Sequence, residues 1–168
     1  MDRLKLKIFE ALSLKITMLE FEKWLYKQEN LMCLIDSNDF IFELVTINYK
    51  NPNSYNYLKN LANENYLEEE CILFLLEKTC LDIINVKTSD KICDKSMEVV
   101  KKYTYDCGYE LLWEIYLLYT QHNLVEIGYM RAKEFNLGFK KEAQKIIQNL
   151  NKCVSLEAKI QLLKNGFL

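Results

Sequence analysis

The stretch Thr-Met-Leu-Glu-Phe-Glu-Lys-Trp-Leu-Tyr, residues 17–26, determines the first part of the fold. Thr17 followed three residues later by Glu20 is a capping box, which begins a helix just before an apolar run. The apolar side chains that follow share one face of that helix: Phe21, Trp24 and Leu25. We expect this face to be buried, because such a stripe packs into a core far more often than it binds a ligand.

Two further stretches continue this pattern. Residues 40–49 read Phe-Ile-Phe-Glu-Leu-Val-Thr-Ile-Asn-Tyr, and residues 55–61 read Tyr-Asn-Tyr-Leu-Lys-Asn-Leu. The first is rich in β-branched and aromatic residues, which suits a strand. Its apolar positions do not alternate, however, and the chain offers it no strand-like partner, so we predict a helix. Pro52 breaks the chain between the two stretches.

Together, the three stretches resemble the opening of the all-α bacterial immunity proteins. The resemblance consists of a short helix, a Phe-Glu-x-Trp-x-Tyr helix, an apolar helix that ends in Asn-Tyr-Lys, and then the helix of Tyr-Asn-Tyr-Leu-Lys-Asn-Leu. Proteins of that family neutralise the toxins of polymorphic or contact-dependent growth inhibition systems. The resemblance covers roughly the first third of the chain. It implies an all-α fold and a cognate toxin, commonly an RNase or DNase domain, as the partner.

The composition also predicts an all-α protein. The 168 residues include one proline and four glycines, and half of them are hydrophobic. All-β domains need many turns, and average proteins contain about 5% proline and about 7% glycine. We therefore expect about eight helices. They would form a small N-terminal helical unit, residues 1–65, packed on a larger C-terminal bundle, residues 66–168.

Helical periodicity recurs along the second part of the chain. A helix is expected over residues 67–81, another near 97–105, and the most apolar one over 111–119. We expect Asn136-Leu-Gly138 to end a helix and Gly166 to end the last one. The residues predicted to form the structural core are Phe21, Trp24, Leu25, Leu75, Leu112 and Ile115.

The sequence contains no recognisable catalytic or cofactor site. The single histidine, His122, has no Gly-x-Ser-x-Gly nucleophile to serve. Four scattered glycines cannot form a phosphate-binding loop. No two cysteines have the Cys-x-x-Cys spacing of a zinc site, so we predict no metal, no cofactor, no small-molecule substrate and no enzymatic activity. We expect all six cysteines to be free thiols: Cys33, Cys71, Cys80, Cys93, Cys107 and Cys153.

The chain start does not look like a targeting segment. The charged start, Met-Asp-Arg-Leu-Lys-Leu-Lys, lacks the apolar region of a signal peptide. No apolar run reaches the length of about 18 residues that a transmembrane helix needs. We therefore expect a cytoplasmic protein without a membrane partner.

The charge is unevenly distributed. Residues 67–138 contain 13 acids and 8 bases, whereas residues 139–168 contain 2 acids and 6 bases. Residues 103–126 contain four acids, no Lys and no Arg, together with five tyrosines and one tryptophan. Carboxylates among aromatic side chains suit an interface with a basic protein. The predicted toxin-binding residues are Glu68, Glu69, Glu70, Asp106, Tyr109, Glu110 and Glu114.

Two alternatives remain at this point. The aromatic residues of 103–126 could instead be half-buried packing beneath an ordinary acidic face. The chain as a whole could be a helical regulatory or nucleic-acid-associated protein that uses its Lys-rich C-terminal region. That region contains no Arg, and the sequence pI of about 5.6 argues against tracking of phosphates. The immunity function is the one that we expect.

Overall fold

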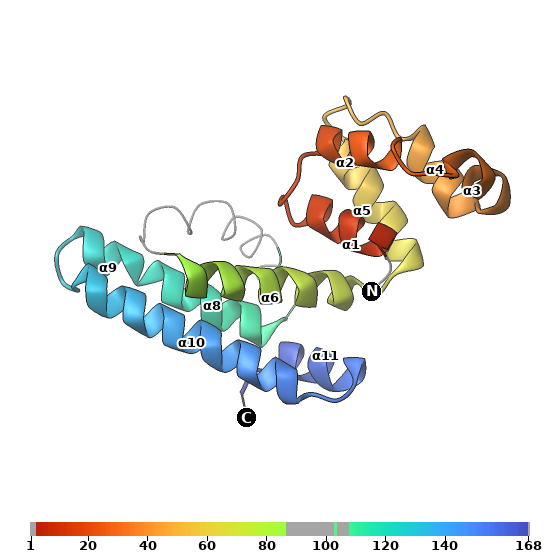
Figure 1. The fold of residues 1–168 in the computed structure, drawn as a ribbon. Helices are drawn as coiled ribbons and strands as arrows, with labels where there is room; N and C mark the ends of the chain where they lie inside the picture. Colours follow the sequence, from red (N-terminus) through yellow and green to blue (C-terminus); the bar gives the residue numbers. More distant parts are fainter. Residues whose placement is uncertain (1–2, 87–102, 104–107, 168) are drawn as a thin grey trace. The chain divides into compact units, whose positions relative to one another are not determined.

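The computed structural model describes residues 3–86, 103 and 108–167, and every regular element among them is an α-helix. The prediction of an all-α fold is therefore confirmed (Figure 1). Nine of these helices have seven or more residues, which is close to the expected number, and α9 is a single short turn. The helices are α1 (Arg3–Leu12), α2 (Met18–Leu25), α3 (Leu31–Ser37), α4 (Asp39–Thr46), α5 (Ser54–Asn65), α6 (Glu68–Asn85), α8 (Glu110–Thr120), α9 (His122–Glu126), α10 (Ala132–Lys152) and α11 (Leu156–Asn165).

The chain divides into two compact units, Met1–Cys71 and Ile72–Leu168. The sequence suggested a boundary after residue 65, in the polar segment that ends α5. The division instead lies inside α6, because the first turn of this helix contacts the N-terminal helices. These are unit 1 and unit 2, respectively.

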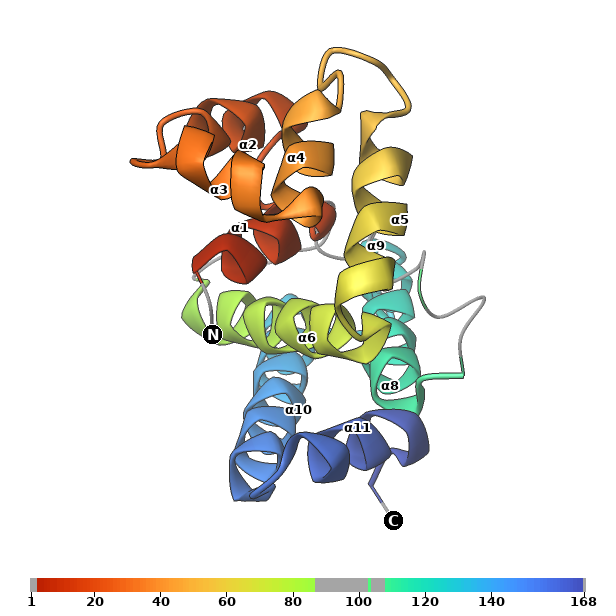
Figure 2. The same ribbon diagram turned by 90° about the vertical axis from the view of Figure 1, so that its right-hand side faces the viewer.

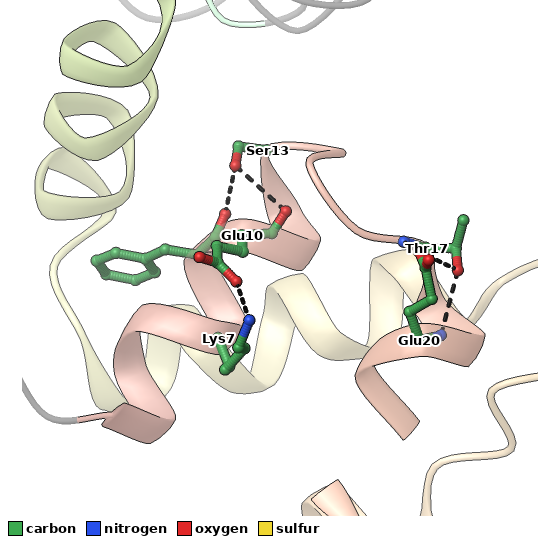
Figure 3. Close-up of polar contacts among 6 residues, drawn as sticks. Lys7, Glu10, Ser13, Thr17 and Glu20 are labelled. Atoms are coloured by element: carbon green, nitrogen blue, oxygen red, sulfur yellow. Dashed lines mark hydrogen bonds and ion pairs between the residues drawn. The ribbon is translucent and has the colours of Figure 1, made fainter. Parts of the chain in front are cut away.

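Two hydrogen-bonding devices order the start of unit 1 (Figure 3). The backbone N–H of Thr17 donates to the Glu20 carboxylate at 2.7 Å, and the backbone N–H of Glu20 donates to the Thr17 hydroxyl at 3.2 Å. The predicted capping box is therefore confirmed. Just before it, the Ser13 hydroxyl donates to the carbonyl of Phe9 at 2.6 Å, and the backbone N–H of Ser13 donates to the same carbonyl at 2.9 Å, so both bonds close the end of α1.

The core of unit 1 is formed by one face of each of its longer helices. Phe21 and Leu25 of α2 are buried, as predicted. The other fully buried large side chains are Ile8, Phe9, Leu12, Leu44 and Leu58. The burial of Leu44 and Ile41 shows that α4 has an amphipathic face, and Asn38 caps this helix by accepting from the N–H of Ile41 at 3.3 Å. The helix prediction for this segment is therefore confirmed over Asp39–Thr46.

The prediction that Trp24 is a buried core residue is wrong. Its side chain is only half-buried, and it lines a hollow of about 180 Å³ that also borders Arg3. The ring stacks on Phe21 with 6.0 Å between centroids, while the Arg3 guanidinium lies 5.9 Å from the ring centroid. Trp24 thus covers the edge of the core. Phe21 and Leu25 are the residues that the buried face of the short helix α2 contributes to the core.

The core of unit 2 lies between α6, α8 and α10. Figures 1 and 2 show α8 and α10 running side by side, with α9 at one end and α11 across the other. The predicted core residues Leu75, Leu112 and Ile115 are all buried, which confirms those assignments. The remaining core members with under 1% exposure are Ile72, Leu76, Cys80, Leu111, Ala143, Ile146, Leu150 and Leu163.

Gly138 does not end a helix, so that prediction is wrong. It lies inside α10, which runs for 21 residues. Glycine in a helix interior costs about 1 kcal/mol relative to alanine. The buried stripe that contains Phe135, Phe139 and Ala143 offsets this cost, since it continues in register through the glycine. The chain turns earlier instead, at Gly128, which has a φ of 80°. Gly166 follows α11 at a φ of 68°, as predicted.

The cysteines that the structure describes, Cys33, Cys71, Cys80 and Cys153, are all free thiols. Cys71 and Cys80 are buried and Cys33 is exposed. Cys93 and Cys107 lie outside the described residues, as does the helix expected near residues 97–105.

Candidate functional site

The outer face of α8 presents alternating carboxylates and large apolar side chains. Glu110, Trp113, Glu114 and Leu117 stand at i, i+3, i+4 and i+7, so they form one strip along the helix. Trp113 is 39% exposed and Leu117 is 44% exposed, and Glu110 is also exposed. The indole packs on Tyr116 with 5.3 Å between ring centroids, which holds it against the helix. We call these four residues the α8 strip.

The strip borders a hollow of about 350 Å³ that Glu114 and Leu117 share with α10 and the chain beyond α11. Lys145 lies at its edge, 2.9 Å from the Glu142 carboxylate, and its ammonium stands 4.0 Å from the centroid of the Phe167 ring. The ammonium is therefore held by an ion pair and a cation–π contact. The hollow combines apolar walls with charges of both signs.

Glu114 is the carboxylate most affected by its surroundings. Desolvation by burial raises its pKa above the ordinary value, and the charges of Glu142 and Glu110 raise it further. The Lys145 ammonium and a hydrogen bond from the Phe167 backbone N–H oppose this rise. Gly166 also lies against Glu114, because a Cβ built on the glycine would stand 3.1 Å from the Oε1 atom. Glu114 thus has a structural role beside any role in binding, whereas Glu110 has no recorded partner among the described residues.

The predicted acidic triplet 68–70 is not a free acidic face. The Lys5 ammonium lies 2.6 Å from the Glu70 carboxylate, and the Lys59 ammonium lies 3.4 Å from that of Glu68. All three glutamates, Glu69 included, are half-buried. The triplet begins α6, where carboxylates also stabilise the positive end of the helix dipole. These carboxylates therefore have intramolecular partners that explain their presence.

The structure does not place the remaining predicted binding residues, Tyr109 and Asp106, on the α8 strip. Tyr109 is 6% exposed and belongs to the core of unit 2, so its assignment as a binding residue is wrong. Tyr109 is the N-cap residue of α8, and its side chain belongs to the same buried cluster as Leu111 and Leu112. Tyr103 is likewise buried at 3%. Asp106 lies outside the described residues.

A second surface was not anticipated from the sequence. The end of α4 and the outer face of α5 enclose a hollow of about 340 Å³, which we call the α4/α5 groove. Its lining contains two carboxylates and an aromatic ring, and no Lys, Arg or His. The lining residues are Glu43, Thr46, Ile47, Asn48, Tyr57, Leu61 and Glu64. On α5, the groove residues Tyr57, Leu61 and Glu64 recur at i, i+4 and i+7, so they share one face of the helix. This spacing does not reveal that the end of α4 packs beside that face.

The lysines of the C-terminal region are largely engaged within unit 2. Lys140 donates to the carbonyl of Val86 at 2.7 Å, and Lys159 lies 3.1 Å from the Glu77 carboxylate. Lys145 pairs with Glu142, as described above. These residues therefore do not form a continuous basic surface of free ammonium groups.

In the described segments, no group of three or more His, Cys, Asp or Glu side chains is arranged to hold a metal ion. None of the described helices is both long and apolar enough to cross a bilayer. Comparisons with protein-family models, with curated proteins and with solved structures gave no match to this chain.

Proposed function

We propose that this protein is a bacterial immunity protein, a non-enzymatic inhibitor that binds a cognate toxin stoichiometrically. The resemblance of residues 17–26, 40–49 and 55–61 to such proteins supports this function, and so does the all-α fold. The observation that carries the proposal is the α8 strip, in which exposed Glu110 and half-buried Glu114 flank exposed Trp113 and precede exposed Leu117.

The composition of the strip suits the catalytic cleft of a nuclease. Such a cleft must hold phosphates, so it is lined with Lys and Arg. Carboxylates can take the place of the phosphates there, and complementary charge speeds the encounter of the two proteins. A tryptophan near the centre of an interface commonly supplies much of the binding energy. We infer that the toxin is an RNase or DNase domain and that the α8 strip contacts it.

The alternative of a nucleic-acid-associated protein receives less support. Lys140, Lys145 and Lys159 have partners within unit 2, so their charges are partly neutralised before any contact with phosphate. Binding through lysine contacts to phosphate would show a steep dependence on salt concentration. Retention of the protein on immobilised DNA that is strong at low salt and lost at high salt would favour this alternative.

The first experiment is co-purification with the protein encoded immediately upstream, followed by measurement of the affinity. Trp113→Ala is expected to weaken the complex by about 30-fold or more, which corresponds to the 2 kcal/mol or more of a hot spot. Glu110→Lys should slow association, and the effect should diminish at high salt.

Glu134→Lys is the matched control for Glu110→Lys. Both glutamates are exposed, both belong to unit 2, and both lie in the first turn of their helix, so the cost to the helix dipole is shared. We expect Glu134→Lys to bind the toxin normally. Native affinity of both Trp113→Ala and Glu110→Lys would remove the α8 strip from the interface. The absence of any toxin partner would overturn the immunity function itself.

A further inference from the structure

The α4/α5 groove of unit 1 concentrates negative charge around an apolar floor. Glu43 contributes a carboxylate from α4, and Glu64 contributes another from the far end of α5. Leu61 and Ile47 line the same hollow, and so does Tyr57, which has 55% of its surface exposed. The chemistry of such a lining is complementary to a side chain that has an apolar stem and a positively charged head.

The groove also lies at the C-terminal end of α4, as its lining residues Thr46, Ile47 and Asn48 show. The carbonyl end of a helix carries a partial negative charge and favours a cation. Three sources of negative potential therefore converge on one hollow. Lys59, although it belongs to α5, does not line the groove, and its ammonium pairs with Glu68 at 3.4 Å.

The groove carboxylates differ from most glutamates of the described chain in having no recorded partner there. No ion pair or hydrogen bond to a described residue is present for the carboxylate of Glu43 or of Glu64, whereas those of Glu10, Glu68, Glu70, Glu77 and Glu142 each pair with a lysine. The Tyr57 hydroxyl has no hydrogen-bond partner among those residues either. These polar groups therefore contribute little to the fold and are available to a ligand.

We propose that the α4/α5 groove binds an arginine side chain, flanked by apolar residues, from a partner protein. The planar guanidinium can donate two parallel hydrogen bonds to a carboxylate and stack on an aromatic ring, which a lysine ammonium cannot do equally well. Glu43 and Glu64 would receive the guanidinium, Tyr57 would stack on it, and Leu61 would contact the apolar neighbours. The proposal does not depend on the toxin-binding function, since the groove belongs to the other unit and is tested with peptides.

The experiment uses the full chain, labelled with nitrogen-15, and three blocked peptides. The first is Ala-Leu-Arg-Leu-Ala, the second replaces Arg by citrulline, and the third replaces it by Lys. Citrulline keeps the shape of the side chain and removes its charge. Each peptide is titrated to about 5 mM, so that dissociation constants in the millimolar range are detected. The readout is the chemical-shift change of each backbone amide.

We expect the arginine peptide to shift the amides of Tyr57, Leu61 and Glu64. The citrulline peptide should bind about tenfold more weakly or worse, since it offers only neutral hydrogen bonds. The double variant Glu43→Gln/Glu64→Gln should lose the response while keeping the native melting temperature. The control Glu29→Gln/Asp36→Asn changes the net charge equally within unit 1 at exposed positions outside the groove, and it should respond as the native protein does.

Four outcomes would overturn the proposal. The first is equal binding of the arginine and citrulline peptides, and the second is the absence of shifts at the groove at the highest concentration. The third is a dimer in sedimentation that dissociates on Glu43→Gln, because it would assign the groove to a second copy of this chain. The fourth is a lysine peptide that binds as tightly as the arginine peptide, because the groove would then not select a guanidinium.

Discussion

The phenolic hydroxyl of Tyr49 donates a hydrogen bond to the backbone carbonyl of Leu44 at 2.7 Å. Leu44 lies in the last turn of α4, where carbonyls have no partner within the helix. Tyr49 is only 2% exposed, and its ring packs on Phe21 with 5.6 Å between centroids. This bond thus closes the end of α4 over the core of unit 1, next to the α4/α5 groove.

Removal of that hydroxyl should destabilise the protein. Tyr49→Phe leaves the buried carbonyl of Leu44 without a donor, which costs about 1–3 kcal/mol. The control is Tyr57→Phe, since the Tyr57 ring is 55% exposed and its hydroxyl has no recorded partner in the described chain. We expect the control to stay within about 0.5 kcal/mol of the native protein. Urea unfolding followed by circular dichroism measures both, and equal stability of the two variants would contradict the assigned bond.

Two aromatic residues of α2 should differ in their contribution to stability. Phe21 is fully buried, so Phe21→Ala should cost about 3–5 kcal/mol in the free energy of unfolding. Trp24 is only half-buried, and Trp24→Ala should cost clearly less, because part of its surface already faces water. Chemical denaturation of the two variants under the same conditions ranks them. A larger loss for Trp24→Ala would show that the indole is a core residue after all.

The two glycines on either side of the start of α10 should respond oppositely to alanine. Gly138 has an ordinary helical φ and open space where a Cβ would stand, so Gly138→Ala should stabilise the protein by about 0.5–1 kcal/mol. Gly128 has equally open space but a φ of 80°, which an alanine adopts only with strain. Gly128→Ala should therefore destabilise the protein. Thermal melting of the two variants provides the test, and a lower melting temperature for Gly138→Ala would contradict the helical assignment.

The buried thiols should make the protein sensitive to alkali. Burial raises the pKa of Cys71 and Cys80 from 9.0 to about 12. Between these two pH values the unfolded chain releases protons that the folded chain keeps, so the free energy of unfolding falls as the pH rises from about 9 to about 12. Urea unfolding under reducing conditions at about pH 8 and about pH 10 measures the decrease. Cys71→Ala/Cys80→Ala should show a smaller decrease than the native protein, and an identical decrease would assign the effect to other groups.

The parts of the fold that depend on neighbouring residues could be predicted from the sequence. The Thr17 and Glu20 capping box is a contact across three residues, and the helix of α4 follows from apolar positions that do not alternate. Gly138 was misread because its local preference for ending a helix is overcome by burial of Phe135 and Phe139, which depends on distant elements.

The binding surfaces were harder to predict for the same physical reason. A tyrosine among acidic residues has the same sequence pattern whether its ring is exposed or buried. The burial of Tyr109 depends on the packing of unit 2, which the local sequence does not show. The α4/α5 groove joins Glu43 and Glu64 from two helices that a loop separates. No spacing within one helix reveals such a pair, because only the contact of α4 with α5 brings them to one hollow.

The two faces of α5 imply different freedom to change during evolution. Leu58 and Ala62 fill the core, so a polar or much larger residue at either position would destabilise unit 1 strongly. Tyr57 and Glu64, on the groove side, can be replaced at almost no cost to stability. In homologous chains we therefore expect Leu58 to stay apolar while Tyr57 and Glu64 diverge. Such a helix allows the binding face to change its partner during evolution while the core face keeps the fold.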